Sequence, residues 1–335
     1  MTRSANIYDV AKLAGVSHQT VSRVLNNHTS VKPETRSKVE KAIAELQYRP
    51  NQAARQLVTS QSHIIGILIS GSDLYGPWAI FNAMQREANL ENYTLVSISV
   101  VPDSSVSLRE AIEQLRNLGI DGVITIALSQ KLITEVEKSL ASAPIVIVDT
   151  EPIKKFDAVN IENFIGGQIA TQHLIDLGHK KILHLTGPIN GFEGQQRRRG
   201  YEAAMHKAKL TPNVIEGDWL IETGYELGTQ IASGKLKASA IFTSNDHQAL
   251  GAIKALSEKN IRVPEDLSIV GFDNIAEAKY FAPALTTIHQ DFDELGKLAI
   301  SRMLVQLKQP TKPQSLTVAP TLVIRESTKR LKASK

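Results

Sequence analysis

Eight apolar runs alternate with amphipathic stretches along most of this chain, and this alternation constrains the fold more than any other feature. The runs are IIGILIS, TLVSISVV, DGVITIAL and PIVIVDT, then KKILHLTG, NVIEGDW, SAIFTSND and LSIVGFD. Only PIVIVDT lacks a helical stretch after it. Continuous Val/Ile-rich strands separated by helices are typical of parallel sheets covered on both faces. Two successive sets of such units predict two similar, doubly wound α/β lobes.

Polar residues stand where these runs end, and ligands of such sheets bind outside the carboxyl ends of the strands. The ends carry Ser70, Asp149, Asn245 and Asp273, and Trp219 is the last residue of the sixth run. Asp and Asn can each make two hydrogen bonds to sugar hydroxyls, and Trp can stack on the apolar face of a pyranose. Asp and Asn also end strands because they favour turns, which is the structural alternative at each position. Turn chemistry does not explain Trp219, so the set predicts a sugar site.

Composition bounds the class of protein. A chain of 335 residues that is 42% hydrophobic can bury more than one core. The absence of Cys excludes disulfides and cysteine metal sites, and we expect no metal and no cofactor. MTRSANIYDV lacks the apolar segment of a signal peptide, and no stretch approaches 18 apolar residues. We therefore expect a cytoplasmic protein that does not enter the membrane.

Charge is concentrated near the N-terminus. Residues 1–61 hold nine Lys and Arg against four Asp and Glu, whereas the remainder holds 29 against 30. An excess of positive charge in one segment suits binding to phosphates, although basic patches also occur on ordinary surfaces.

The same N-terminal segment contains two short helical patterns joined by a tight turn. Apolar residues repeat at helical spacing in both patterns: Ile7, Val10, Ala11 and Ala14, then Val21, Val24 and Leu25. Asn6 and Ser17 are good N-caps, and Gly15 stands where the turn needs a residue without Cβ strain. The pattern predicts a helix-turn-helix, and an ordinary amphipathic hairpin is the alternative.

The second of these helices would enter the major groove of DNA with its N-terminus first. His18, Gln19 and Arg23 would then face outward, and Gln can read adenine while Arg can read guanine. Short polar side chains suit phosphate contacts, which set register without reading sequence. These are Ser17, Thr20, Ser22 and Asn26.

A third helical pattern starts at Pro33, and YRPNQAARQLVTSQS then breaks the chain before a short Ala-rich helix that ends at Leu57. The whole arrangement resembles the lactose-repressor and galactose-repressor family of bacterial transcription regulators, over the full chain. The resemblance implies an all-α helix-turn-helix headpiece (residues 1–50), a hinge helix with linker (51–62) and an α/β core of the periplasmic-binding-protein type (63–335). In that core the first lobe would comprise about 63–161 and 291–319, and the second about 162–290 and 320–335.

The resemblance also implies which residues contact an operator in double-stranded DNA. They are Ile7, Tyr8, Ser17, His18, Gln19, Thr20, Ser22, Arg23, Asn26, Ser30, Asn51, Ala54 and Leu57. In this family the hinge helix folds on DNA beside its twin, and the two leucines at the position of Leu57 wedge into a base step of the minor groove. A buried anchor of the linker is the alternative role for Leu57.

The effector contacts implied by the resemblance come from both lobes. They are Ser70, Leu74, Gly76, Pro77, Ile80 and Asp149 in the first lobe, Arg197, Trp219, Asn245 and Asp273 in the second, and Gln290 and Phe292 at a crossover. Arg197 belongs to a run of three arginines, and only its three-residue spacing to Gly200 selects it.

Four core segments, GDW, SNDHQALGA, VGFDN and LTTIHQDFDELG, resemble lactose-type members more than purine-type members. We therefore expect a small sugar as inducer, a galactoside or another β-linked saccharide. The headpiece departs from the lactose type at His18, which replaces a tyrosine and so implies a different operator. Lys32 replaces the usual serine cap before Pro33, which should weaken that helix start by about 1 kcal/mol.

A single headpiece makes few phosphate contacts, so we expect a homodimer that reads a pseudo-palindrome. The C-terminal RESTKRLKASK has no leucine heptad to make a tetramer. Catalysis is not expected, because GPINGFEG lacks the Gly-Lys-Ser/Thr of a phosphate loop and no nucleophile elbow occurs. The remaining alternatives are a transport-type sugar-binding protein, or a regulator that responds to a sugar phosphate or a purine.

Overall fold

The computed structural model describes residues 5–25, 30–48, 61–140, 143–188 and 190–331. The chain forms two compact units, residues 1–62 and 63–335. Four residues expected to contact DNA lie outside the described residues: Asn26, Asn51, Ala54 and Leu57.

The described residues of the N-terminal unit form three helices, α1 (Ile7–Ala14), α2 (His18–Leu25) and α3 (Pro33–Glu45). The Asn6 side chain accepts hydrogen bonds from the backbone N–H groups of Tyr8 and Asp9. The Asp9 carboxylate accepts one from the Asn6 N–H in return, which completes a capping box.

The turn between α1 and α2 follows the same local chemistry. Gly15 ends α1 with a φ of +66°, a left-handed conformation that favours glycine. The Ser17 hydroxyl then accepts a hydrogen bond from the Thr20 N–H at 3.2 Å. Lys32 precedes α3 without a side-chain cap, as its sequence predicts. Caps matter here because helices of eight residues are marginal on their own.

The three helices enclose a small apolar core. Its fully or almost fully buried members are Val10, Ala11, Val21, Val24, Val39 and Ala42. The Arg36 guanidinium donates to the Val24 carbonyl at 3.3 Å and so ties α3 to the end of α2. All buried residues of this unit that the structure describes are hydrophobic.

The larger unit contains two six-stranded sheets, ordered β11-β5-β4-β3-β1-β2 and β12-β10-β9-β8-β6-β7. The first sheet comprises β1 (Ile64–Ser70), β2 (Thr94–Val100), β3 (Gly122–Ile126), β4 (Ile145–Val148), β5 (Asp157–Ile161) and β11 (Ser315–Val318). The second comprises β6 (Ile182–Leu185), β7 (Asn213–Ile215), β8 (Ala240–Thr243), β9 (Ser268–Asp273), β10 (Thr286–His289) and β12 (Thr321–Val323). All described neighbours pair in parallel except β10 and β12, which are antiparallel. The two doubly wound lobes expected from the alternation are confirmed.

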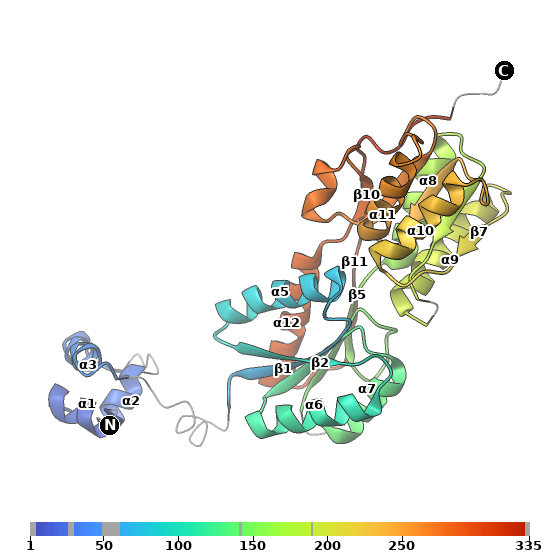
Figure 1. Ribbon diagram of the computed structural model, residues 1–335. Helices are drawn as coiled ribbons and strands as arrows, with labels where there is room; N and C mark the ends of the chain where they lie inside the picture. Colours follow the sequence, from blue (N-terminus) through green and yellow to red (C-terminus); the bar gives the residue numbers. More distant parts are fainter. Residues whose placement is uncertain (1–4, 26–29, 49–60, 141–142, 189, 332–335) are drawn as a thin grey trace. The chain divides into compact units, whose positions relative to one another are not determined.

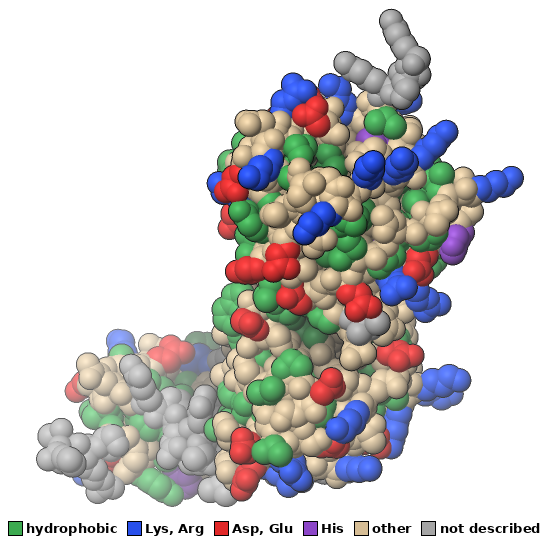
Figure 2. Space-filling view, turned by 45° about the vertical axis from the view of Figure 1, so that its right-hand side comes forward, with side chains coloured by type: hydrophobic (Ala, Val, Ile, Leu, Met, Phe, Trp, Pro, Cys, Tyr) green, Lys and Arg blue, Asp and Glu red, His purple; other side chains and the backbone are tan. Residues whose placement is uncertain are grey.

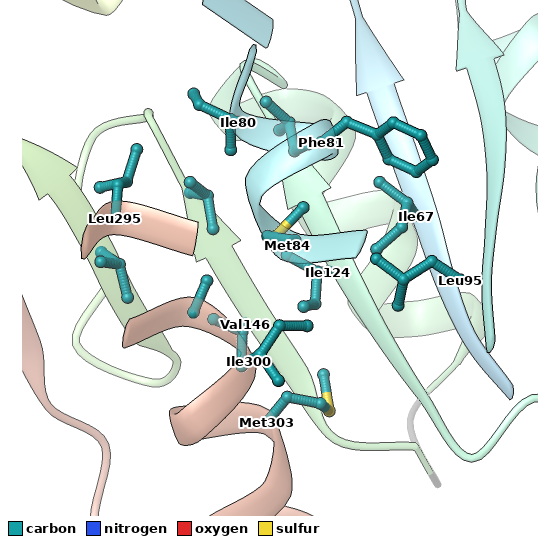
Figure 3. Close-up of a cluster of buried hydrophobic side chains, with 14 of the residues drawn as sticks. Ile67, Ile80, Phe81, Met84, Leu95, Ile124, Val146, Leu295, Ile300 and Met303 are labelled. Atoms are coloured by element: carbon teal, nitrogen blue, oxygen red, sulfur yellow. The ribbon is translucent and has the colours of Figure 1, made fainter. Parts of the chain in front are cut away.

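Helices cover both faces of the first sheet (Figure 1). On one face lie α5 (Tyr75–Leu90) and α12 (Phe292–Lys308), and on the other α6 (Ser105–Leu118) and α7 (Gln130–Ser139). Figure 3 shows the core beneath α5 and α12, where Met84 and Ile300 meet Ile124 and Val146. Full burial of such a side chain contributes about 1.5–3 kcal/mol, so this cluster holds the lobe together.

The second sheet is covered in the same way (Figure 1). The pair α8 (Asn163–Asp176) and α9 (Phe192–Lys207) packs on one face. The pair α10 (Ile221–Ala232) and α11 (Asp246–Ser257) packs on the other, and a 3-10 turn η1 (Ala276–Tyr280) follows β9.

The chain crosses between the lobes three times. It leaves the first lobe after β5, returns between β10 and α12, and leaves again between β11 and β12. Within the described residues, no helix combines the length and the apolar character that a membrane crossing requires.

Candidate functional site

The exposed face of α2 carries the side chains expected to read bases. His18, Gln19 and Arg23 are all exposed. The Tyr8 ring, which is 63% exposed, lies 5.1 Å from the His18 ring between centroids. Neither Gln19 nor Arg23 forms a hydrogen bond or ion pair with the described residues, so both are available to base edges.

The side chains expected at phosphates lie around the same helix. Ser17 and Ser30 are exposed, whereas Ile7, Thr20 and Ser22 are half-buried. The hydroxyls of Ser17 and Thr20 lie 2.9 Å apart at the start of α2. This end of the helix presents backbone N–H groups and the positive end of the helix dipole, which both favour a phosphate.

A cleft of about 600 Å³ lies between the two lobes of the larger unit and draws its walls from both. Small-molecule sites usually fall between about 300 and 1,000 Å³. Eleven of the twelve residues expected to contact an effector line it: Ser70, Leu74, Gly76, Pro77, Asp149, Arg197, Trp219, Asn245, Asp273, Gln290 and Phe292.

The twelfth prediction, Ile80, needs correction. Ile80 is fully buried in the first-lobe core and does not line the cleft. Figure 3 shows its side chain with Phe81 above the core cluster. Pro77 lies on the same helix, one turn nearer to the cleft. The helix therefore turns Ile80 toward the sheet.

Arg197 is the centre of a buried hydrogen-bond network. Its Nε donates to the Asn163 side chain at 2.7 Å, and its Nη1 donates to the Ser244 carbonyl. Nη1 also lies 3.7 Å from the Asp273 carboxylate, and the Gln290 amide donates to that carboxylate at 2.6 Å. The network fixes the guanidinium before any ligand arrives, which lowers the entropic cost of binding.

The structure also resolves the run of three arginines. Arg197 lies on the buried face of α9 with Gly194, Gly200 and Tyr201, at helical spacing. Arg198 is half-buried and pairs with Glu202 one turn along the surface. Packing against α8 therefore decides which guanidinium points inward.

Trp219 forms an aromatic wall of the cleft. Its carbonyl accepts a hydrogen bond from the Asn245 side chain at 2.8 Å. The Trp219 ring lies against the backbone of Gly187, where a Cβ would come within 2.2 Å of the ring. Because Gly187 carries no side chain, the Trp219 ring can pack directly against the backbone of the Gly187-Pro188 loop, and this contact holds the ring in place.

Backbone strain gathers around this cleft. Five of the eleven non-glycine residues that the structure describes with positive φ line it: Asp103, Ala127, Asp149, Trp219 and Asp273. Such conformations cost of order 1–3 kcal/mol each and are found mostly where function requires them. The cleft is therefore a site that the fold maintains against a local energy cost.

The cleft is strongly acidic. Seven acidic residues line it, namely Asp73, Asp103, Asp149, Glu151, Glu193, Asp218 and Asp273, against the single basic residue Arg197. In Figure 2, acidic side chains gather at the level between the two lobes, and many Lys and Arg side chains lie farther out on the same face. Burial raises the pKa of Asp273 to about 7, although the neighbouring Arg197 charge opposes the rise.

Sequence reasoning missed several cleft residues, and Glu193 is the most consequential. It lies in the first turn of α9, and its carboxyl group is hydrogen-bonded to that of Asp149 from the other lobe. The segment GPINGFEG contains it and stood out only as a failed phosphate loop. One sequence signal could have found it: an acidic residue at the start of a helix that follows the carboxyl end of a strand, where ligands of such sheets bind.

Residues 6–51 match the family described as bacterial regulatory proteins, lacI family, and residues 171–328 match a periplasmic binding protein-like domain. The chain is 35% identical to the HTH-type transcriptional repressor PurR of Haemophilus influenzae, over 98% of this chain and 99% of that protein. The chain belongs to the lacI family. It is also 36% identical to the ribose operon repressor of Escherichia coli, over 96% of this chain and 99% of that protein.

Solved structures agree. A crystal structure of the lac repressor dimer, bound to operator and the anti-inducer ONPF, superposes with a TM-score of 0.89 at 31% identity, over 98% of this chain and all of that one. This lacI-family protein is therefore a DNA-binding transcription regulator and not an enzyme. The helix-turn-helix prediction is confirmed. Membership of a family of transcription regulators excludes the alternative of a transport-type sugar-binding protein.

Proposed function

We propose that this protein is a dimeric transcriptional repressor whose affinity for its operator falls when a small sugar binds in the interlobe cleft. One observation carries the proposal: Trp219, a preorganised arginine network and several carboxyl and amide groups converge on a single cleft of about 600 Å³. An aromatic face with hydrogen-bonding groups of both kinds around it suits the alternating apolar and hydroxyl surfaces of a saccharide.

Charge argues against the sugar-phosphate alternative. Arg197 is the one basic residue among the described residues that line the cleft, and it already donates to Asn163 and Ser244. A phosphate would bring two negative charges toward seven acidic residues without a free cation. A purine could stack on Trp219, so it remains a second candidate that the first screen must include.

A galactoside or another β-linked saccharide is the proposed effector class. Its support is the structural similarity of the whole chain to the lac repressor. The ribose operon repressor is more similar in sequence, at 36% identity against 31%, so ribose belongs in the same screen.

The proposed switch uses the two walls of the cleft. A sugar would bridge Asp149 of the first lobe to Arg197, Asn245 and Asp273 of the second. Closure would move the first lobes of the dimer, and the hinge segment that contains Leu57 would lose its pairing on DNA. A ligand shifts such an equilibrium only by its different affinity for the two states, typically 1–3 kcal/mol, or about 5- to 150-fold in operator affinity.

The test begins with the operator. Selection from a randomised duplex pool should yield a pseudo-palindrome, because two headpieces would bind it in the two-fold symmetric dimer. A thermal-shift screen then compares galactosides, glucosides, ribose, purine bases and sugar phosphates on the full-length protein. Each compound that raises the melting temperature is added to a mobility-shift assay with the selected operator.

The expected result is that one saccharide stabilises the protein and releases it from the operator. A stabilising purine with no stabilising sugar would show that the effector class is wrong. A sugar that tightens operator binding would show a corepressor instead of an inducer, and light scattering of a salt-resistant tetramer would contradict the dimer.

A further inference from the structure

Two carboxyl groups from opposite lobes meet inside the cleft. Asp149 follows β4 of the first lobe, and Glu193 lies in the first turn of α9 of the second. Their side chains are within hydrogen-bonding contact. Two ionised carboxylates repel at this distance, so the contact requires either a shared proton or a cation.

Asp149 also has an oxygen that no residue of the described chain satisfies. Its side chain is 93% buried, since 7% of its surface is exposed, and Oδ1 has no hydrogen-bond partner among the described residues. A buried acceptor without a donor costs about 1–3 kcal/mol. Oδ1 itself is shielded from solvent, and Asp149 lines the cleft, so a donor for this oxygen would come from a ligand that binds there.

Among the described residues that line the cleft, no free cation is available to neutralise the pair. Arg197 lines the cleft, and it is held by Asn163, Ser244 and Asp273. Burial raises the pKa of Asp149 and Glu193, the charge of Asp149 raises the pKa of Glu193 further, and the Arg197 charge partly opposes both rises.

A metal ion fits this pair poorly. A divalent cation takes six or more oxygen ligands or a set of three to four protein ligands. The described residues contain no group of three or more His, Cys, Asp or Glu side chains that could hold one. An ammonium group needs less, because its three N–H donors can reach both carboxylates and the unsatisfied Asp149 oxygen.

We propose that Asp149 and Glu193 together form a subsite for a positively charged amino group, so that the effector is an amino sugar. The inference rests on the proposed sugar-controlled repressor and narrows its effector class. The amino group would replace the shared proton of the carboxyl pair, and the pyranose would lie against Trp219. Because the two carboxyls come from different lobes, the same ammonium would hold the cleft closed.

Matched sugars test this directly. Isothermal titration of the full-length protein at pH 7 would compare galactose, galactosamine and N-acetylgalactosamine, the three corresponding glucose sugars, and the 6-amino-6-deoxy forms of both hexoses. One amino sugar should bind about 10- to 100-fold more tightly than its hydroxyl parent, because hydrogen bonds to charged groups are worth more than neutral ones. Its N-acetylated form should lose that gain, because acetylation removes the charge.

Two variants place the amino group. E193Q and D149N should each bring the ratio of the amine's affinity to the neutral parent's affinity to within about threefold of one, whatever each does to the affinity for the parent itself. Asn tolerates the φ of +53° at position 149, so D149N should fold, and circular dichroism verifies this. The control is E151Q, the same chemical change at an exposed cleft carboxylate that accepts from Gln130, and it should keep the preference.

The outcomes separate the two proposals. A neutral sugar that releases the operator and gains nothing from any amino group would overturn the amine subsite and leave the repressor proposal standing. An amine preference that survives in both E193Q and D149N would also overturn the subsite. If no saccharide of either kind changes the melting temperature or operator binding, the sugar-controlled repressor fails and the subsite fails with it.

Discussion

The headpiece and the interlobe cleft are built for opposite charges. Residues 1–61 carry nine basic side chains against four acidic ones, whereas the cleft is lined by seven acidic side chains and one basic one. The headpiece exposes its polar side chains on a short helix, and the cleft buries its own in a hydrogen-bonded network. One region therefore suits a polyanion through long-range attraction, and the other selects a small molecule by contact and repels anions.

Salt should separate the two regions most strongly. Operator affinity should fall by about 10³- to 10⁵-fold between 50 and 200 mM salt, as counterions are released from six to ten neutralised phosphates. Sugar affinity should change by less than about twofold, because the contacts in the cleft are buried and short-range. Fluorescence anisotropy with the operator and calorimetry with the sugar measure both, and a sugar affinity as salt-sensitive as the operator's would contradict the comparison.

Arg197→Ala should damage the cleft and spare the headpiece. The change leaves Asp273 buried without its partner, which costs about 3–5 kcal/mol of unfolding free energy and removes measurable sugar binding. Urea denaturation and calorimetry measure the two effects, and operator binding should stay within about threefold. The matched control is the neighbouring Arg198→Ala, which loses a surface pair worth about 0.2–1 kcal/mol.

Equal effects of the two arginine substitutions would show that the buried network carries no special role. Loss of operator binding in Arg197→Ala, with the fold intact, would show instead that the cleft and the headpiece are not independent in the sugar-free state.

Gln19→Ala should alter base preference without altering general DNA binding. The Gln19 side chain is exposed on α2, and its loss should cost about 1–3 kcal/mol at one symmetric pair of operator positions. Competition with single-base operator variants measures this, and binding to an unrelated duplex is the control. A uniform loss across all sequences would assign Gln19 to the phosphate backbone.

Protonation of His184 should destabilise the larger unit as the pH falls, whereas the cleft carboxyls whose pKa burial raises act in the opposite sense. Burial lowers the pKa of His184 to about 3, its ring stacks on Phe242 at 4.4 Å, and its Nδ1 donates to the Phe242 carbonyl at 2.9 Å. A histidine whose pKa is lower in the folded state than in the unfolded state stabilises the fold fully at pH values above its unfolded pKa of about 6.5. This stabilisation is lost progressively as the pH falls from there toward the folded pKa of about 3. The loss should reach about 1.4 kcal/mol at pH 5.5.

H184Q should change this acid limb of the curve of unfolding free energy against pH: relative to the native protein, its unfolding free energy should rise by about 1.4 kcal/mol between about pH 7.5 and pH 5.5, measured by urea titrations followed by circular dichroism. The exposed His206 supplies the control, H206Q, which should leave the limb unchanged. The headpiece core that the structure describes buries only hydrophobic side chains, so its own transition should not shift over this range. An unchanged limb in H184Q would place the acid sensitivity elsewhere.

Local sequence signals predicted much of the fold because the interactions behind them are local. The capping box of Asn6 and Asp9 and the positive φ of Gly15 follow from neighbours in the chain. Eight strands were predictable because their apolar runs need burial on both faces. The strand β5, with sequence DAVNI, escaped prediction because two of its five residues are polar.

Asp157 is satisfied by partners that are distant in the chain, whereas Asn160 has a partner ten residues away and an amide nitrogen without a partner among the described residues. Arg302 and the Gln314 N–H both donate to the Asp157 carboxylate, and the Thr150 N–H donates to the Asn160 side chain. The sequence of one strand cannot reveal the hydrogen bonds of Asp157, because they join residues 145 and 157 positions apart in the chain. The short outer strands β11 and β12 were missed because three or four residues carry too little pattern.

The sequence by itself determined the headpiece, the doubly wound lobes and eleven of the residues that line the cleft. These follow from spacing along one element or from motifs shared with the family. The tertiary structure decided that Arg197 and not Arg198 turns inward, that Ile80 faces the core, and that Glu193 meets Asp149. Each of these depends on how two elements pack, and packing brings together residues whose separation in the chain carries no signal.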